Sequence, residues 1–426
     1  MPLPSTALFT DRYELTMLTA ALGDGTAGRR CSFEVFSRRL QHGRRFGVVG
    51  GTGRLLAAIE AFRFTDEQLR PLLAERVIDD RAAEFLAGYR FSGDVAGYPE
   101  AEPYFPRSPI LSVTGSFAEA VVLETVVLSV LNHDSAVAAA AARMVIAAGD
   151  RPIIEMGSRR THEEAAVAAA RIAYLVGFAA SSNLAAAARY AVPTAGTAAH
   201  AFTLLHESEA AAFASQIRAL GIGTTLLVDT YDIGRGIETA IEVAGPGLGA
   251  VRIDSGDLAV MAHRSRAQLD GLGARATRIV VSGDLDEYAI AALAAAPVDA
   301  YGAGTAVVVG SGVPTAELVY KLVEVDGRPV AKRSENKSSV GGRKLAYRRH
   351  RPSGTAIEER VVPADSGFEP AETDRPLTIP LVMGGRRVDH RSLADSRAHH
   401  RAAVGALPWD ALKLSKGDPG LPVVFG

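Results

Sequence analysis

Ile279-Val280-Val281-Ser282-Gly283-Asp284 is one of six stretches in which a short apolar run ends in a cluster of Gly, Asp, Ser, Arg or His. The runs cover residues 152–156, 192–195, 226–228, 251–253, 279–281 and 300–301, and the clusters cover 157–160, 196–200, 229–232, 254–257, 282–284 and 302–305. Ala-rich segments with helical character separate several of these runs, at 163–176, 207–220 and 286–295. This alternation indicates βαβ units of a parallel sheet. We therefore predict an irregular parallel α/β barrel, with the clusters gathered at its mouth.

The segments on either side of the predicted barrel have a different character. Residues 1–115 alternate short β-like runs with helical pieces, and the chain after residue 325 is polar, rich in Gly and Arg, and ends in a predicted helix at 395–407. We predict an N-terminal α/β domain of residues 1–115, completed by the C-terminal segment 325–426. The barrel domain then spans 116–324. It opens with helices at 119–131 and 135–148, which we expect to be broken around 132–134.

Composition restricts the class of protein. A chain of 426 residues with 48% hydrophobic content can bury a large core, and its net charge of -2 argues against nucleic acid or an anionic membrane as the main partner. The single Cys31 excludes a disulfide framework and a multi-cysteine zinc site, so we expect a buried thiol and no zinc. The N-terminus lacks a signal-peptide pattern, and charged residues interrupt the Ala runs. We expect a cytoplasmic enzyme that is not in a membrane.

Lysines are concentrated in one part of the chain. The 46 basic residues include six Lys and therefore 40 Arg (46 − 6), and four of the six Lys fall between Lys321 and Lys344. Lys binds phosphate as a flexible point charge, so this segment is a candidate phosphate site. Chance clustering in a solvated loop is the alternative.

Glycines follow the last two predicted strands. Gly283, Gly302 and Gly304 stand where α/β barrels commonly bind a phosphate through backbone N–H groups, because glycine lets the backbone approach an anion closely. Glycine is also the default turn residue, so phosphate binding and simple turns both remain open from this pattern.

Two Asp-x-x-Asp pairs end neighbouring strands. Asp229 and Asp254 come directly after the apolar runs, where carboxylates can hold sugar hydroxyls or Mg²⁺, whereas Asp232 and Asp257 are equally explained as helix N-caps. His200 follows 196–199 and is a candidate general base, phosphate partner or phosphoryl acceptor. A structural role is the alternative for any single histidine.

The ordered set of motifs resembles the nicotinate phosphoribosyltransferase family over nearly the whole chain. The opening 10–17 (TDRYELTM) is similar to the family's N-terminal signature, and 157–160, 196–200, 229–232, 252–257 and 302–305 occur in the family's order. The resemblance implies an ATP-dependent enzyme of NAD salvage that forms nicotinate mononucleotide from nicotinate and phosphoribosyl pyrophosphate (PRPP). It also implies Mg²⁺ as cofactor and a homodimer with shared active sites. A C-terminal cysteine-rich metal knuckle, present in some members, is excluded by the single cysteine.

The resemblance also implies roles for individual residues. Tyr13 would stack on the pyridine ring from the neighbouring subunit, with Met156 on the other side and Arg159 facing the carboxylate. Arg252, Asp254 and Asp229 would bind ribose and pyrophosphate, the two Asp being candidate Mg²⁺ ligands. His200 matches the residue that ATP phosphorylates. The remaining substrate and phosphate positions are Gly283, Gly302, Gly304 and Thr305 for the 5′-phosphate end, and Lys332, Lys337 and Lys344 for phosphates of the substrates or ATP.

Residues 180–183 bear on the choice between acid and amide. Nicotinamide-using relatives carry an Asp after the Arg turn, and here the corresponding stretch is Ala180-Ser181-Ser182-Asn183. An Asp would repel the carboxylate of nicotinate, whereas Ser182 or Asn183 can donate a hydrogen bond to it without a charge penalty, so the sequence favours nicotinate.

Three alternative functions fit the sequence less well. The nearest is a nicotinamide or quinolinate phosphoribosyltransferase, although quinolinate should require more basic residues at the ring end. A non-catalytic barrel that binds a nucleotide would not need His200, Asp229 and Asp254 together. A Schiff-base aldolase is disfavoured because no Lys ends a strand before Lys321.

Overall fold

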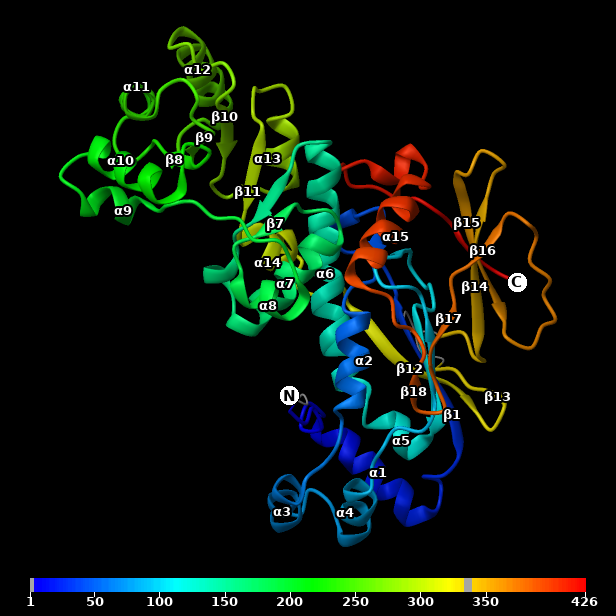
Figure 1. Cartoon of the computed structure of the whole chain (residues 1–426). Helices are drawn as coiled ribbons and strands as arrows, with labels where there is room; N and C mark the ends of the chain where they lie inside the picture. The colour runs from blue at the N-terminus through cyan, green and yellow to red at the C-terminus, as the bar shows by residue number, and fades with distance from the viewer. Residues whose placement is uncertain (1–3, 333–338) are drawn as a thin grey trace. The chain divides into compact units, whose positions relative to one another are not determined.

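The computed structural model describes residues 4–332 and 339–426, which form two compact units (Figure 1). Unit 1 combines Met1–Ala138 with Thr315–Gly426, and unit 2 is Ala139–Pro314. The sequence placed the second domain at 116–324. The difference arises because the strand Leu318–Val325 pairs with Arg30–Ser37, and because the first half of one long helix packs in unit 1.

Unit 1 is built around a seven-stranded sheet in the order β13-β12-β1-β5-β3-β17-β18. Its strands are β13 (Arg328–Pro329), β12 (Leu318–Val325), β1 (Arg30–Ser37), β5 (Leu111–Ser116), β3 (Asp94–Gly97), β17 (Ile379–Met383) and β18 (Arg386–Arg387). All of the pairings are antiparallel, and those of β1 with β12 and of β3 with β17 join N-terminal to C-terminal segments. Strands from both ends of the chain therefore belong to one sheet.

Smaller sheets and helices complete unit 1. A four-stranded sheet has the order β16-β14-β15-β19, with β16 (Asp374–Pro376), β14 (Lys344–His350), β15 (Ala356–Pro363) and β19 (Val423–Phe425), and β2 (Gly47–Val48) pairs with β4 (Pro103–Tyr104). The helices are α1 (Arg12–Asp24), α2 (Thr52–Glu60), α3 (Asp66–Ala74), α4 (Asp80–Ala87), α5 (Phe117–Val121) and α15 (Leu393–Gly405). Cys31 is buried in this unit, as expected.

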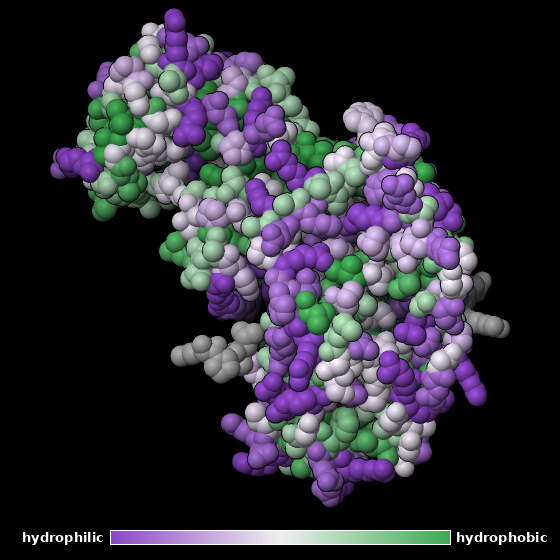
Figure 2. Space-filling model, turned by 45° about the vertical axis from the view of Figure 1, so that its right-hand side comes forward, coloured by the Kyte–Doolittle hydropathy of each residue, from purple (hydrophilic) through white to green (hydrophobic). Residues whose placement is uncertain are grey.

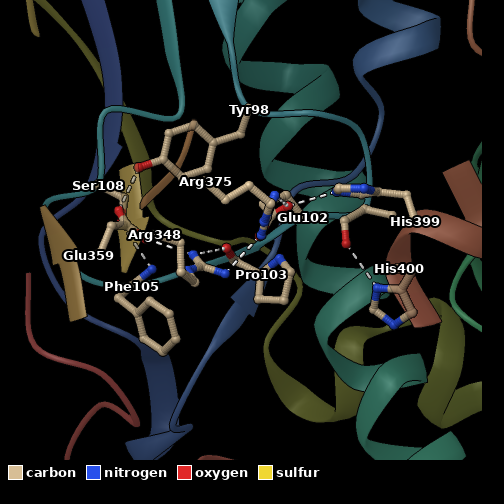
Figure 3. A network of polar contacts seen from close by, with 11 residues as sticks. Tyr98, Glu102, Pro103, Phe105, Ser108, Arg348, Glu359, Arg375, His399 and His400 are labelled. Atoms are coloured by element: carbon tan, nitrogen blue, oxygen red, sulfur yellow. Dashed lines mark hydrogen bonds and ion pairs between the residues drawn. The ribbon is translucent and has the colours of Figure 1, made fainter. Parts of the chain in front are cut away.

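A buried polar network ties the C-terminal segment to the loop before β4 (Figure 3). Glu102 accepts hydrogen bonds from Arg348 at 2.7 Å, from Arg375 at 2.7 and 2.9 Å, and forms a 2.7 Å contact with Nε2 of His399. Arg348 also donates to Glu359 at 2.7 Å. These charges are compensated by one another, and this compensation makes their burial tolerable.

One long helix, α6 (Glu124–Ala148), replaces the two predicted helices. The expected break around 132–134 is wrong because tertiary partners occupy the polar side chains. Asn132 accepts from the Leu318 N–H at 2.7 Å, and Asp134 accepts from Arg54 at 2.6 and 2.8 Å. These groups therefore do not compete for the helix backbone.

By length and composition, one helical stretch of the described residues, Phe117–Ala148, could cross a membrane. Its apolar window is 67% buried inside the protein, as is common for core helices of folded proteins.

Unit 2 contains a parallel six-stranded sheet in the order β7-β6-β11-β10-β9-β8. The strands are β7 (Ala180–Ser181), β6 (Ile153–Glu155), β11 (Ala300–Ala303), β10 (Arg278–Val281), β9 (Ala250–Ile253) and β8 (Thr225–Leu227). Five of the six predicted runs form strands. The sixth, 192–195, makes only an isolated bridge between Thr194 and Ser181. The parallel α/β architecture is confirmed, in the form of a curled, open half-barrel.

Helices connect these strands: α7 (Glu163–Leu175), α8 (Leu184–Tyr190), α9 (His200–Leu205), α10 (Glu209–Leu220), α11 (Ile233–Ala244), α12 (Leu258–Gly271), α13 (Glu287–Ala292) and α14 (Thr305–Val308). Around α9 and α10 several large apolar side chains are exposed, namely Leu204, Leu205, Leu220 and Ile222. Figure 2 shows hydrophobic residues, in green, on the lobe that contains these helices. Exposed apolar surface of this kind often serves as a contact surface.

Candidate active site

A cleft of about 430 Å³ lies at the carboxyl ends of the unit 2 strands. Parallel strands place the residues that follow them at one edge of the sheet, so six separate loops contribute to the same cleft. Its lining consists of Met156, Ser158, Arg159, Arg160, Ser182, Gly196, Thr197, Ala198, Ala199, Arg252, Asp254, Ser282, Gly283, Asp284, Gly302, Gly304 and Thr305. Nine of the predicted site residues are therefore brought together, from Met156 to Thr305.

At three of the four glycines that line the cleft, a side chain would meet close neighbours. Gly283 has a φ of +107°, and a β-carbon there would lie 2.6 Å from the carbonyl oxygen of Asp254. At Gly302 a β-carbon would lie 2.9 Å from Sδ of Met156, and at Gly304 it would lie 3.1 Å from the carbonyl oxygen of Met156. The three positions thus bring bare backbone to the cleft, as a phosphate site requires.

Asp229 and Asp254 are linked through the backbone of the β9 loop. Oδ2 of Asp229 accepts from the Asp254 N–H and from the Ser255 hydroxyl, both at 2.8 Å. Oδ1 of Asp229 is buried and, among the described residues, has no hydrogen-bond partner. Asp254 accepts from the Ser282 hydroxyl. One carboxylate oxygen is therefore left for a cation or a protonated group.

His200 is the first residue of α9, beside Asp229. Nε2 of His200 lies 3.9 Å from Oδ1 of Asp229, and Nδ1 lies 3.3 Å from Oγ1 of Thr230. Neither His200 nor Asp229 lines the cleft, but Asp229 holds the backbone of Asp254, which does. The other two Asp are N-caps, since Asp232 and Asp257 accept from the N–H groups of Arg235 and Val260.

Arg252 lines the cleft as a partly buried cation. It donates to the Thr197 hydroxyl, and its Nε is buried without a partner in the part of the chain that the structure describes. Burial lowers the pKa of Arg252, and the neighbouring Asp254 and Asp229 oppose that effect. A cation with an unused donor in a polar cleft is suited to bind an anionic substrate.

The remaining predicted residues lie in unit 1 or outside the described chain. Tyr13 is 46% exposed on α1, and Lys332 is exposed. Lys344 is buried and pairs with Glu34 at 2.9 Å, while it donates to the carbonyl groups of Val340 and Gly342. A phosphate role for Lys344 would require it to give up these contacts. Lys337 lies outside the described residues.

Sequence reasoning missed Glu155, the last residue of β6. Its side chain is fully buried, and it accepts hydrogen bonds from the Gly157 N–H and the Ser181 hydroxyl. The available signal was a charged residue inside an otherwise apolar run, 152–156.

The fold is an α/β half-barrel, and the cleft at its strand ends is lined by the cationic side chains of Arg159, Arg160 and Arg252. The family model for the nicotinate phosphoribosyltransferase (NAPRTase) N-terminal domain matches residues 8–132. A nicotinate phosphoribosyltransferase, pncB1, of Mycobacterium tuberculosis is 60% identical over 423 residues, which cover 97% of this chain and 94% of that protein. The Bacillus subtilis nicotinate phosphoribosyltransferase is 36% identical over 359 residues, covering 81% and 73%. The chain belongs to the nicotinate phosphoribosyltransferase family.

A solved structure agrees with this assignment. The crystal structure of human nicotinic acid phosphoribosyltransferase is 27% identical, with a TM-score of 0.84 and coverage of 98% of this chain and 97% of that one. The likeness therefore extends over both units of the fold. The resemblance read from the sequence is confirmed.

Proposed function

We propose that this protein forms nicotinate mononucleotide and pyrophosphate from nicotinate and PRPP, a salvage step of NAD biosynthesis. The observation that carries the proposal is the family relationship over nearly the full chain, together with the cleft that gathers Arg252, Asp254 and the three glycines. Product analysis tests it directly. Purified protein with PRPP and Mg²⁺ is given nicotinate, nicotinamide or quinolinate, and the proposal expects a mononucleotide from nicotinate; none, or one from another base alone, would overturn it.

The reaction needs alignment and charge stabilisation more than proton transfer. The pyridine nitrogen attacks the anomeric carbon of PRPP as the bond to pyrophosphate breaks, through a transition state with oxocarbenium character. Arg252 offsets the negative charge that collects on the leaving group, and Arg159 faces the carboxylate of the base. The backbone at Gly283, Gly302 and Gly304 receives the 5′-phosphate. Fixed alignment of this kind lowers the barrier without acid or base chemistry.

Magnesium fits the available ligands as a cation shared with the substrate. No group of three or more His, Cys, Asp or Glu that could hold a metal occurs in residues 4–332 and 339–426. Mg²⁺ commonly binds through one or two carboxylates plus substrate phosphates. The free Oδ1 of Asp229 and the carboxylate of Asp254 match that pattern. The metal, when bound, neutralises charge on the pyrophosphate.

For the choice of base we propose nicotinate over nicotinamide. Ser182 lines the cleft at the end of β7, and Arg159 and Arg160 line it at the end of β6. We call Arg159, Arg160 and Ser182 the rim of the cleft. Its two cations and its hydroxyl group favour a carboxylate ligand over a neutral amide.

We further propose that the reaction is coupled to ATP hydrolysis through His200. The γ-phosphoryl group would pass from ATP to a ring nitrogen of His200, releasing ADP, and water would later take the phosphoryl group as inorganic phosphate. The contact with Asp229 supports this role, because a carboxylate beside an imidazole orients the ring. Acid-labile ³²P from γ-labelled ATP should appear on the wild-type protein and not on His200→Asn.

The proposed assembly is a cytoplasmic homodimer with shared active sites. Tyr13 is exposed on unit 1, and in the dimer it stacks on the base that is bound in the cleft of the partner subunit. The exposed apolar residues around α9 and α10 provide surface for contact between subunits. Lys332 is exposed and free to reach a phosphate of the substrates or ATP. Sedimentation at micromolar concentration tests the dimer.

A further inference from the structure

Glu155 is a buried carboxylate that ends β6, one residue before Met156 of the cleft lining. One of its oxygens accepts from the Gly157 N–H, and the other accepts from the Ser181 hydroxyl at 2.5 Å. Its carbonyl oxygen also accepts from the Ser182 N–H at 2.8 Å. Both Glu155 and Ser181 have no exposed surface. Two neighbouring strand ends are thus joined through one side chain.

The hydrogen bonds continue from Glu155 across the floor of the rim. Oγ of Ser181 accepts from the Asn183 N–H at 2.9 Å, and Nδ2 of Asn183 donates to Oγ of Ser158 at 3.0 Å. Oδ1 of Asn183 accepts from the Ala186 N–H at 2.8 Å and so caps α8. The hydrogen bonds thus lead back to the turn that Glu155 itself contacts, and Arg159 and Ser182 each directly follow a residue of this network.

We infer that Glu155 is the positioning residue that fixes the Gly157–Arg160 turn and the Ser182–Asn183 turn in the geometry that receives the pyridine base. The inference rests on the proposed function, since that function assigns Arg159 and Ser182 to the nicotinate carboxylate. Glu155 itself does not line the cleft, so it acts through these residues and not on the substrate.

A carboxylate is required because both of its oxygens receive donors. A glutamine would present an amide nitrogen to one of these two donors, and either Gly157 or Ser181 would lose its acceptor. None of the contacts of Glu155 found in the described chain is with Lys or Arg, and burial raises the pKa of its carboxyl group. Such burial is costly, so a role in holding the rim explains the charge better than stability does.

The test is Glu155→Gln, with steady-state kinetics measured separately for nicotinate and for PRPP. The inference expects the KM for nicotinate to rise about tenfold, while the KM for PRPP changes less than about twofold. Glu287→Gln is the matched control. Glu287 is a buried carboxylate of the same unit that accepts from Arg143 at 2.9 Å and Ser311 at 2.7 Å, and none of these residues lines the cleft. It should leave both KM values unchanged.

Ser181→Ala provides a second variant if Glu155→Gln fails to fold, because it removes the link with a smaller change. It should raise the KM for nicotinate in the same direction. An unchanged KM for nicotinate in a folded variant, or equal rises for both substrates, would overturn the inference while leaving the proposed function intact. If the wild-type protein forms no mononucleotide from nicotinate, the proposed function fails and this inference fails with it.

Discussion

Nε2 of His200 lies 3.9 Å from Oδ1 of Asp229, an oxygen that is buried and has no hydrogen-bond partner in residues 4–332 and 339–426. The other oxygen of Asp229 holds the N–H of Asp254 at the cleft. This carboxylate therefore joins the proposed phosphoryl acceptor to the substrate site. Oδ2 positions the backbone of Asp254, whereas Oδ1 faces His200, so the two contacts can be tested separately.

Asp229→Asn should separate these two contacts. The amide oxygen can still accept from Asp254 and Ser255, while the amide nitrogen replaces the oxygen that faces His200. We expect ATP-stimulated formation of the mononucleotide to fall on the order of 100-fold. The rate without ATP should fall as well, but by less, because Oδ1 of Asp229 is also a proposed Mg²⁺ ligand. Asp232→Asn is the control, since Asn caps a helix as well as Asp does; an equal loss in both variants would contradict the account.

Arg252→Lys should weaken the binding of PRPP. The guanidinium of Arg252 donates to Thr197 through one nitrogen and, within the described residues, keeps its Nε–H without a partner. Lys cannot reproduce this planar group, so we expect the KM for PRPP to rise at least about tenfold. Arg278→Lys is the control, because Arg278 is exposed at the opposite end of the neighbouring strand β10. Titration of PRPP at saturating nicotinate measures the effect. Unchanged PRPP kinetics would remove Arg252 from the site.

Gly302→Ala should disturb the predicted phosphate end of the cleft. The new methyl group would lie 2.9 Å from Sδ of Met156 and 3.0 Å from Cβ of Ser282, so both side chains must move. We expect the KM for PRPP to rise about tenfold, with thermal unfolding reported in parallel. Gly223→Ala has open space around the new methyl group and should behave as wild type. A Gly302→Ala enzyme with normal kinetics would argue against a phosphate at this position.

Ser182→Asp should lower the use of nicotinate. A carboxylate at this place on the rim would repel the carboxylate of the base, and it could accept a hydrogen bond from the amide of nicotinamide. We expect kcat/KM for nicotinate to fall on the order of 100-fold, which corresponds to about 2.7 kcal/mol. Competition between the two bases measures the change in preference. Retained preference for nicotinate would contradict the assignment of Ser182.

The buried His400 predicts how stability depends on pH. Nδ1 of His400 donates to the carbonyl oxygen of Ala101 at 2.9 Å, and burial lowers the pKa of His400 to about 4. A histidine whose pKa is lower in the folded state contributes stability that is complete above pH ~6.5 and is lost as the pH falls towards ~4. The contribution is on the order of 3 kcal/mol.

Urea unfolding at pH 7, 6 and 5 measures this effect in wild type and in His400→Asn, whose amide can replace the Nδ1 donor. The variant should lose less stability than wild type between pH 7 and pH 5. Parallel curves for the two proteins would show that His400 does not titrate on unfolding.

The pKa of Glu102 is lowered, because the effects of Arg348, Arg375 and His399 outweigh the effect of burial. The contribution of Glu102 to stability is therefore lost only at more acidic pH, below the ordinary range for Glu.

Much of unit 2 could be predicted because its signals are local. An apolar run followed by Gly, Asp or Ser predicts a strand and its loop, and this rule found β6, β8, β9, β10 and β11. It failed at 192–195, where the chain makes only one bridge. The continuous α6 could not be foreseen, since the partners of Asn132 and Asp134 are Leu318 and Arg54, distant in sequence.

The candidate site likewise contains residues that local sequence predicts and residues that depend on contacts between strands. Asp254 directly follows a predicted strand and could be placed at the cleft from the repeat alone, whereas Arg252 lies inside β9 and was assigned to the site only through the family resemblance. Glu155 could not be assigned a role, because its contact with Ser181 forms only when β6 and β7 pair. The pairing of Lys344 with Glu34 depends in the same way on a contact between distant strands.

The measurement that tests the central claim most directly is the stoichiometry of products from nicotinate, PRPP and Mg²⁺, with and without ATP. Purified wild-type protein should form nicotinate mononucleotide, and with ATP present the yield should rise while ADP accumulates alongside the product. Mononucleotide without any effect of ATP would contradict the coupling through His200. Absence of mononucleotide under both conditions would contradict the proposed function itself.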